Sequence, residues 1–145
     1  MNDRNSRERA ACPDRMTIRR AGTAIARAPD GVSSGPFWAE LLLESAQEGE
    51  INVVLATLDP GVVTHWHTHP RGQGLLVLAG VGRAQAEGGP AEEVRAGDFV
   101  WFAPGEPHWH GASPDSVFSY VTVQAVRDGT MVRWLGPVAL ERSLP

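Results

Sequence analysis

The sequence contains no lysine, because all 13 of its basic residues are arginines, and its one cysteine is Cys12. Without lysine, mechanisms that use a lysine Schiff base or a lysine general base are excluded. One cysteine can form neither an intrachain disulfide nor a zinc site of several thiolates. No apolar run approaches the roughly 18 residues of a membrane helix, so we expect no membrane contact. The net charge of −4 lacks the basic excess of nucleic-acid-binding proteins, so we expect no nucleic-acid partner.

What remains is a short chain with a concentration of histidines. Its 145 residues suffice for one domain and are too few for two. The 16 glycines and 11 prolines favour many turns over long helices. All five histidines fall in two clusters, 65–69 and 108–110. The composition therefore predicts a histidine site.

The chain divides into a leader and one domain. Residues 1–15 are polar, show no apolar period and lack the apolar core of a secretory signal. We expect this leader to be disordered and the protein to be cytoplasmic. Residues 16–145 are expected to form the single domain.

From Met16 onward the pattern is that of an all-β sandwich or barrel, with short runs rich in Val, Leu, Phe, Trp and Thr between turn residues. The expected strands are 16–20, 37–44, 51–58, 62–68, 73–79, 82–86, 98–102, 108–112, 117–126 and 131–135. Residues 37–45 could also form a short helix, because nine residues cannot settle the period. Asp128-Gly129 predicts a hairpin turn.

Alternation along a strand places alternate side chains on one face. His65, His67 and His69 then share one face, and Thr64, Trp66 and Thr68 the other. A second strand repeats the pattern with His108 and His110. In a third, Tyr120 and Gln124 belong to a mixed polar face that could line a pocket.

Two such strands can supply a metal site. A His-x-His pair directs two imidazoles to one side, and a third from a neighbouring strand completes a facial set with open positions. His67, His69 and His108 fit this arrangement, and Gln73 could add an amide oxygen. These ligands do not fix the metal. An amide oxygen and open positions favour Mn or Fe, while Zn or Ni remains possible.

Two stretches resemble the paired motifs of the cupin family, whose fold is a jelly-roll barrel (double-stranded β-helix). Residues 61–80 match the first motif at Gly61, His67, His69, Gln73 and Gly80. Residues 97–112 match the second at Gly97, Gly105 and His108. Three positions differ from the usual pattern: Gln73 replaces glutamate, Ala103 replaces proline with Pro104 one residue later, and Ala112 replaces asparagine.

With Gln73, the sequence resembles a subgroup of small bacterial cupins that includes manganese-dependent hydroxynitrile lyases. That resemblance implies a metal held by His67, His69, Gln73 and His108. It also implies a pocket lined by Thr64, His110 and Gln124, with Val54 and Ala56 as small wall residues. Tyr120 stands where those lyases tend to carry a histidine, and His65 where they carry a small residue.

Three imidazoles and a neutral amide would leave a divalent ion its full charge, which favours Lewis-acid chemistry. We expect a small-molecule substrate and a hydroxynitrile lyase-like carbon–carbon cleavage. His110 would be the base, and Gln124, Thr64 and Tyr120 would orient the substrate. The alternatives are a quercetinase-like dioxygenase, a polyketide cyclase-like cupin that uses His65 as a further ligand, and a non-catalytic binding module. We also expect a homodimer or higher homo-oligomer formed through the apolar strand 37–44.

Overall fold

A computed structural model describes residues 10–140, which form ten strands and no helix, and hence no helix that could cross a membrane. The strands are β1 (Ile25–Arg27), β2 (Phe37–Leu43), β3 (Ile51–Leu58), β4 (Trp66–Thr68), β5 (Gln73–Ala86), β6 (Glu92–Arg95), β7 (Phe99–Phe102), β8 (His108–Ala112), β9 (Phe118–Ala125) and β10 (Arg133–Gly136). The prediction of an all-β fold is confirmed.

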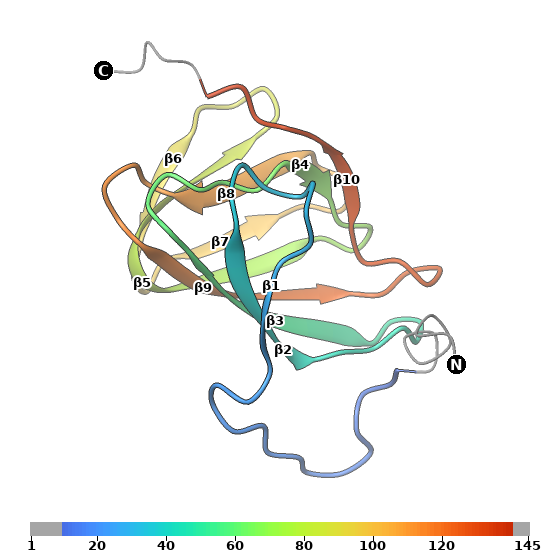
Figure 1. Ribbon diagram of the computed structural model, residues 1–145. Helices are drawn as coiled ribbons and strands as arrows, with labels where there is room; N and C mark the ends of the chain where they lie inside the picture. The colour runs from blue at the N-terminus through green and yellow to red at the C-terminus, as the bar shows by residue number, and fades with distance from the viewer. Residues whose placement is uncertain (1–9, 141–145) are drawn as a thin grey trace.

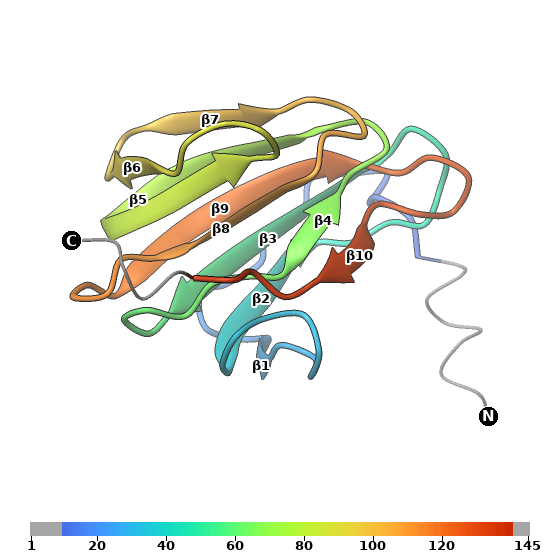
Figure 2. The ribbon, with the colours of Figure 1, turned by 90° about the horizontal axis from the view of Figure 1, so that it is seen from above.

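The strands pair antiparallel in two layers that face each other (Figure 1). In the first layer, hydrogen bonds join β1, β2, β3, β9, the first half of β5 and β7 in that order. In the second, β10 pairs β4, β4 pairs β8, and the second half of β5 pairs both β8 and β6. Figure 2 shows β4 and β10 side by side at the edge of this layer.

The long strand β5 joins the layers because it changes partners near its middle. Its register with β9 shifts between Val77 and Ala79. Gly80 follows with φ of 77°, a conformation that favours glycine. A Cβ at Gly80 would lie 1.7 Å from the carbonyl oxygen of Val117, so no other residue fits there.

The core fills one end of the space between the layers. Inward-facing side chains of β3, β5 and β9 dominate it, including Leu58, Leu75, Val77 and Phe118. Toward the other end the inward positions become polar, with Asn52, Gln73, Thr122 and Gln124 all buried. Alternation along the same strands therefore builds both the core and a cavity that contains buried polar groups.

Several strand predictions need correction. Residues 16–20 form no strand, while 25–27 and 92–95 do. The latter segment has a run of charges without apolar alternation, and only its pairing with β5 makes it a strand. The helix considered for residues 37–45 is wrong, because 37–43 is a strand. Residues 73–86 form one strand instead of two, and only 66–68 of the expected strand 62–68 is regular.

The hairpin turn at Asp128-Gly129 is confirmed. Both residues have positive φ, 51° and 76°, as a type I′ turn requires, and Arg127 bridges to Thr130.

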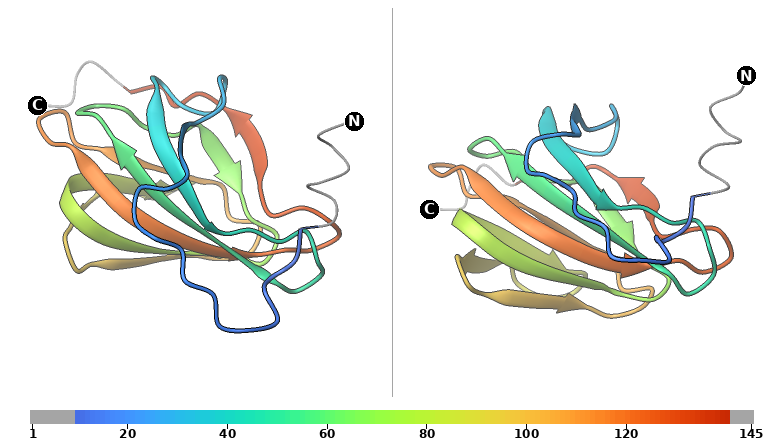
Figure 3. Two further views of the ribbon diagram at one scale, coloured as in Figure 1. Left: turned by 60° about the horizontal axis from the view of Figure 1, so that its bottom comes forward. Right: turned by 90° about the horizontal axis from the view of Figure 1, so that it is seen from below.

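Part of the expected leader is described and contacts the domain. The carbonyl of Ala10 accepts a hydrogen bond from Ala46 N, and Cys12 N donates to Glu50 Oε1. Further along, Arg19 Nε donates to the carbonyl of Leu42 near the end of β2. Figure 3 shows this N-terminal segment, in blue, running past β2 on the outside of the first layer. Residues 1–9 lie outside the described part of the chain.

Candidate metal centre

A cavity of about 130 Å³ lies between the two layers. Both layers contribute to its wall: β2, β3, β9 and the start of β5 from one side, and β4, β8 and β10 from the other. Its lining residues are Phe37, Val54, Ala56, Thr64, His67, His69, Gln73, His110, Tyr120, Thr122, Gln124, Met131, Val132 and Trp134.

Four buried imidazoles converge at this cavity. The ring of His67 lies 5.0 Å from that of His69, 4.3 Å from that of His108 and 5.2 Å from that of His110. His67, His108 and His110 offer nitrogens within 4.8 Å of one another. Phe102 stacks on His108 at 3.7 Å and holds that ring in place. Such a cluster of nitrogen donors suits a metal ion.

Backbone carbonyls fix the tautomer of three of these rings. His67 Nδ1 lies 2.7 Å from the carbonyl oxygen of His65, His69 Nδ1 lies 2.7 Å from that of Met131, and His108 Nδ1 lies 2.8 Å from that of Glu106. A carbonyl can only accept, so each Nδ1 carries the hydrogen. Each Nε2 then keeps a lone pair free for a metal, as in known sites where a metal-ligating histidine donates its other N–H.

Gln73 presents its oxygen to this cluster because its nitrogen is bonded elsewhere. Its Nε2 donates to Gln124 Oε1 at 3.0 Å, and Gln124 Nε2 donates in turn to the carbonyl of Asn52 at 3.2 Å. Since that carbonyl accepts only, the orientation of both amides is determined. Gln73 Oε1 is left 3.2 Å from His108 Nε2.

These contacts fit a bound cation. With the hydrogen on Nδ1, His108 Nε2 is an acceptor, so two lone-pair atoms face each other across 3.2 Å. His69 Nε2 is also buried and has no hydrogen-bond partner within residues 10–140. Buried acceptors without donors are costly, and a cation would satisfy all three. The Nε2 atoms of His67, His69 and His108 and Gln73 Oε1 are therefore available to a cation, and the nitrogens of His110 lie in the same cluster as those of His67 and His108.

Burial keeps all four imidazoles neutral at neutral pH. Burial, with the neighbouring His108 and His69, lowers the pKa of His67 to about 2, despite its bond to the His65 carbonyl. Burial likewise lowers the pKa of His69 and of His108 to about 4. For His110, burial and the three neighbouring imidazoles hold the pKa well below its usual value. Neutral imidazole is the form that binds metals and accepts protons.

His110 differs from the other three rings. Neither of its ring nitrogens has a hydrogen-bond partner in the described part of the chain, although both are buried. Its ring meets Tyr120 edge to face at 4.9 Å, and its backbone N–H donates to Thr64 Oγ1. Burial raises the pKa of Tyr120, so its phenol remains a hydrogen-bond donor at neutral pH.

The structure brings most of the expected site residues together. His67, His69, Gln73 and His108 converge, and His110, Tyr120, Gln124 and Thr64 line the same cavity, as do Val54 and Ala56. Alternation alone placed Thr64 on the face opposite the histidines, which is wrong, because the regular strand begins only at Trp66. His65 is half-buried and is not a lining residue; it contributes its carbonyl to His67.

Sequence reasoning missed part of the wall. The ring of Trp134 lies 4.7 Å from that of His67 and lines the cavity with Met131 and Val132. Only the pairing of β10 with β4 brings these residues to the site. No local signal marks that long-range pairing.

Comparisons with known proteins agree with this fold. Residues 54–124 match the model of the cupin domain. The chain is 41% identical over 128 residues to an (R)-mandelonitrile lyase of Granulicella tundricola, covering 88% of this chain and 98% of the relative.

Solved structures give the same result. A cupin-like protein of Thermotoga maritima has a TM-score of 0.74 and 31% identity, covering 86% of this chain and 92% of that one. The polyketide cyclase RemF of Streptomyces resistomycificus, at 20% identity and a TM-score of 0.67, covers 88% of this chain and 89% of its own and shares the fold. The chain belongs to the cupin family.

Proposed function

We propose that the protein is a metal-dependent hydroxynitrile lyase, which cleaves a cyanohydrin into an aldehyde and hydrogen cyanide. The observation that carries the proposal is His110, a neutral imidazole at the cavity whose two ring nitrogens have no hydrogen-bond partner within residues 10–140, and which lies close to the nitrogens of His67 and His108. The 41% identity to an (R)-mandelonitrile lyase supports the same reaction.

His67, His69, Gln73 and His108 would hold the metal, for which we propose Mn or Fe. When bound, the metal would supply Lewis acidity toward an oxygen of the substrate. The groups around it would select and orient that substrate. Tyr120 can donate its phenolic hydrogen, and Thr64 can donate its hydroxyl hydrogen because its oxygen already accepts from His110 N.

His110 would act as the general base that transfers the proton. One of its ring nitrogens accepts the proton of the cyanohydrin hydroxyl. The oxygen's electrons form the carbonyl as the carbon–carbon bond breaks, and cyanide leaves with the bonding pair. The imidazolium then returns the proton to cyanide. The reaction involves no net oxidation or reduction, so it needs no oxidant.

The cavity suits a small aromatic substrate. Its volume of about 130 Å³ is close to that of apolar cavities, about 150 Å³, that hold benzene. Phe37, Val54, Met131 and Trp134 form apolar walls around the polar cluster. The aryl group of a cyanohydrin would contact these walls, and the hydroxyl group of the same molecule would face His110.

The test is release of benzaldehyde from mandelonitrile, followed by absorbance with metal-loaded protein. We expect wild-type protein to release benzaldehyde and His110→Ala to lose about 10²–10⁴-fold in rate, as removal of a general base does. His65→Ala is the matched control, since that side chain does not line the cavity and should leave the rate unchanged. Equal rates for wild type and His110→Ala would contradict the proposal.

We further propose that the protein forms a homo-oligomer. The interface we propose is the outer face of β5, β7 and β9, and not strand 37–44. The outer face of β5, β7 and β9 carries four exposed apolar side chains: Leu76, Phe99, Trp101 and Val123. Phe99 and Trp101 are 66% and 57% exposed. Apolar side chains gathered on one sheet face are typical of an interface. A second copy of the chain is the partner we propose.

A further inference from the structure

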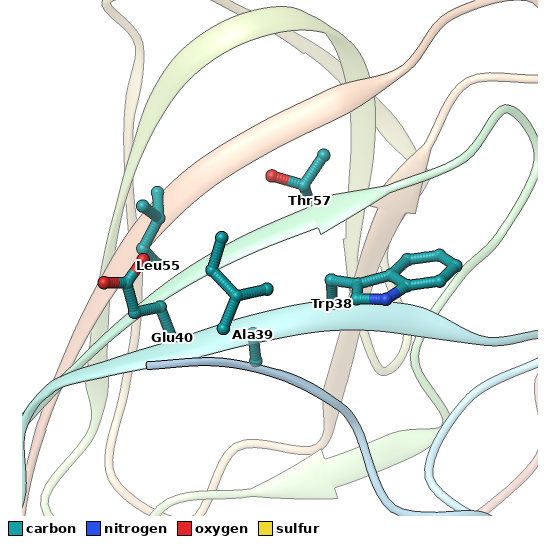
Figure 4. A pocket seen from close by; sticks show the side chains of 6 residues that line it. Trp38, Ala39, Glu40, Leu55 and Thr57 are labelled. Carbon is teal, nitrogen blue, oxygen red and sulfur yellow. The ribbon is translucent and has the colours of Figure 1, made fainter. Parts of the chain in front are cut away.

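The outer face of the first layer carries a groove of about 330 Å³ that has no part in the proposed reaction (Figure 4). Since neighbouring residues of a strand point to opposite faces, Trp38 and Glu40 of β2 point away from the cavity that Phe37 lines. The groove is lined by Ile25, Trp38, Ala39, Glu40, Leu55 and Thr57.

Glu40 is a buried carboxylate without a partner. Its cross-strand neighbours are Ile25 on β1 and Leu55 on β3, and it is only 3% exposed. Its Oε1 has no hydrogen-bond partner in the described chain. Within residues 10–140 no arginine forms an ion pair with Glu40: Arg27 pairs with Asp30 at 3.6 Å, and Arg19 Nε donates to the Leu42 carbonyl. An unpaired buried carboxylate is energetically costly, so a positively charged hydrogen-bond donor would stabilise Glu40.

Apart from the hydroxyl of Thr57, the rest of the groove is lined by apolar side chains and by the indole ring of Trp38. Trp38 lies two residues from Glu40 along β2, a distance of about 7 Å. Leu55 and Thr57 line the neighbouring strand, and in Figure 4 they lie beside Glu40 and Trp38. The exposed indole offers apolar area and a face that attracts cations.

We propose that this groove binds a small organic cation, a protonated amine joined to an apolar body. The ammonium group donates to Glu40, and the apolar body extends along Leu55 to the ring of Trp38. A metal ion does not suit the groove, because one carboxylate among apolar walls lacks the several oxygen ligands that Ca²⁺ or Mg²⁺ requires. A neutral ligand could donate a hydrogen bond to the carboxylate but would leave its charge uncompensated.

The test is calorimetric titration of the full chain with 2-phenylethylamine and with 2-phenylethanol, which replaces the ammonium by a hydroxyl. The variants are Glu40→Gln and, as a control with the same change of net charge, Glu44→Gln, whose side chain is exposed just after β2. We expect wild type and Glu44→Gln to bind the amine about tenfold or more tightly than the alcohol. Glu40→Gln should lose that preference.

Equal affinity for amine and alcohol in the wild type, or unchanged amine affinity in Glu40→Gln, would overturn the proposal. Light scattering on the same samples tests whether a second copy of the chain occupies the groove instead. If Glu40→Gln abolishes self-association, a second copy occupies the groove and the small-cation proposal is wrong. Should Glu40→Gln fail to fold by thermal melting, Trp38→Leu replaces it. That variant should weaken binding of 2-phenylethylamine more than of butylamine, and equal effects would also overturn the proposal.

Discussion

At the scale of single residues, the site depends on hydrogen bonds that determine which atom each side chain presents. Three backbone carbonyls direct Nε2 of His67, His69 and His108 inward. Gln124 was expected to orient the substrate, but its oxygen and one of its N–H groups are bonded to Gln73 and Asn52. These bonds fix the orientation of the Gln73 amide, so we infer that Gln124 is a positioning residue for Gln73, the proposed metal ligand.

Gln124→Leu should lower the affinity for Mn²⁺ about 10–100-fold, as loss of a residue that orients a ligand does. Without Gln124 Oε1, the amide of Gln73 can rotate and turn its nitrogen toward the cluster. Titration calorimetry measures the affinity. Ser119→Ala, on the same strand but bonded to Thr57, is the control. Equal Mn²⁺ affinity in Gln124→Leu and wild type would contradict this role.

The buried imidazoles also predict how stability depends on pH. Their pKa values of about 2 for His67 and about 4 for His69 and His108 lie below the value of about 6.5 expected for the unfolded chain. The unfolded chain therefore binds more protons below about pH 6.5, so the free energy of unfolding falls as pH falls.

Urea denaturation of metal-free protein at several pH values between 7.5 and 5 measures this dependence. Each imidazole should lower the unfolding free energy by up to about 1.4 kcal/mol per pH unit below 6.5. Because the pKa of His110 is lowered by burial too, His110→Leu should show a smaller slope. A stability that is flat or rises on acidification would show that these rings are protonated in the fold.

Strand alternation predicted that His67 and His69 share a face, and the spacing of the two cupin-like motifs pointed to Gln73 and His108; the four side chains do lie together. Spacing could not find the acceptor of His69, because Met131 lies 62 residues away. Nor could it find Trp134, whose role depends on the same returning segment.

At the scale of elements, β5 determines how the two layers meet. It pairs with β9 and β7 before Gly80, and with β6 and β8 after it. The sequence predicted strands on both sides of Gly80 but read them as two. Gly80 marks a change of partner within one strand, and that is visible only once the partners are known. β1 and β6 escaped notice because their pairing, more than their side chains, makes them strands.

Gly80→Ala should destabilise the fold by more than about 3 kcal/mol, because a Cβ there would lie 1.7 Å from the Val117 carbonyl oxygen. Gly88→Ala is the matched control. Its φ of 82° is similar, but no atom lies within 4 Å of its Cβ position, so it should cost only about 1 kcal/mol. Urea denaturation compares the two. If Gly80→Ala and Gly88→Ala lowered the free energy of unfolding by similar amounts, the backbone around Gly80 would have made room for the added Cβ at no energetic cost, which would contradict the prediction.

At the scale of the whole molecule, one barrel separates two environments. The inside holds the core and the histidine cluster, and the outer face of the first layer holds the groove at Glu40 and the exposed apolar side chains. The overall fold could be predicted because the paired histidine motifs and the strand rhythm agree. The groove could not, since a buried glutamate on an outer face has no sequence signature.

The proposed interface predicts the mass in solution. Light scattering should give a multiple of the 15.6 kDa chain mass for wild type, and the single-chain mass for Phe99→Lys, which places a charge on the apolar face. Leu135→Lys makes the same change at an exposed leucine of the other layer and should leave the mass unchanged. A wild-type protein that stays at 15.6 kDa at all concentrations would exclude the interface.

Removal and return of the metal test the central claim most directly. The protein is purified without an affinity tag, its metal content is measured by elemental analysis, and it is then chelated and assayed with mandelonitrile. We expect the chelated protein to release no benzaldehyde above buffer, and Mn²⁺ or Fe²⁺ to restore release in wild type but not in His67→Ala. A chelated protein that is free of metal and still cleaves mandelonitrile at the original rate would contradict the account.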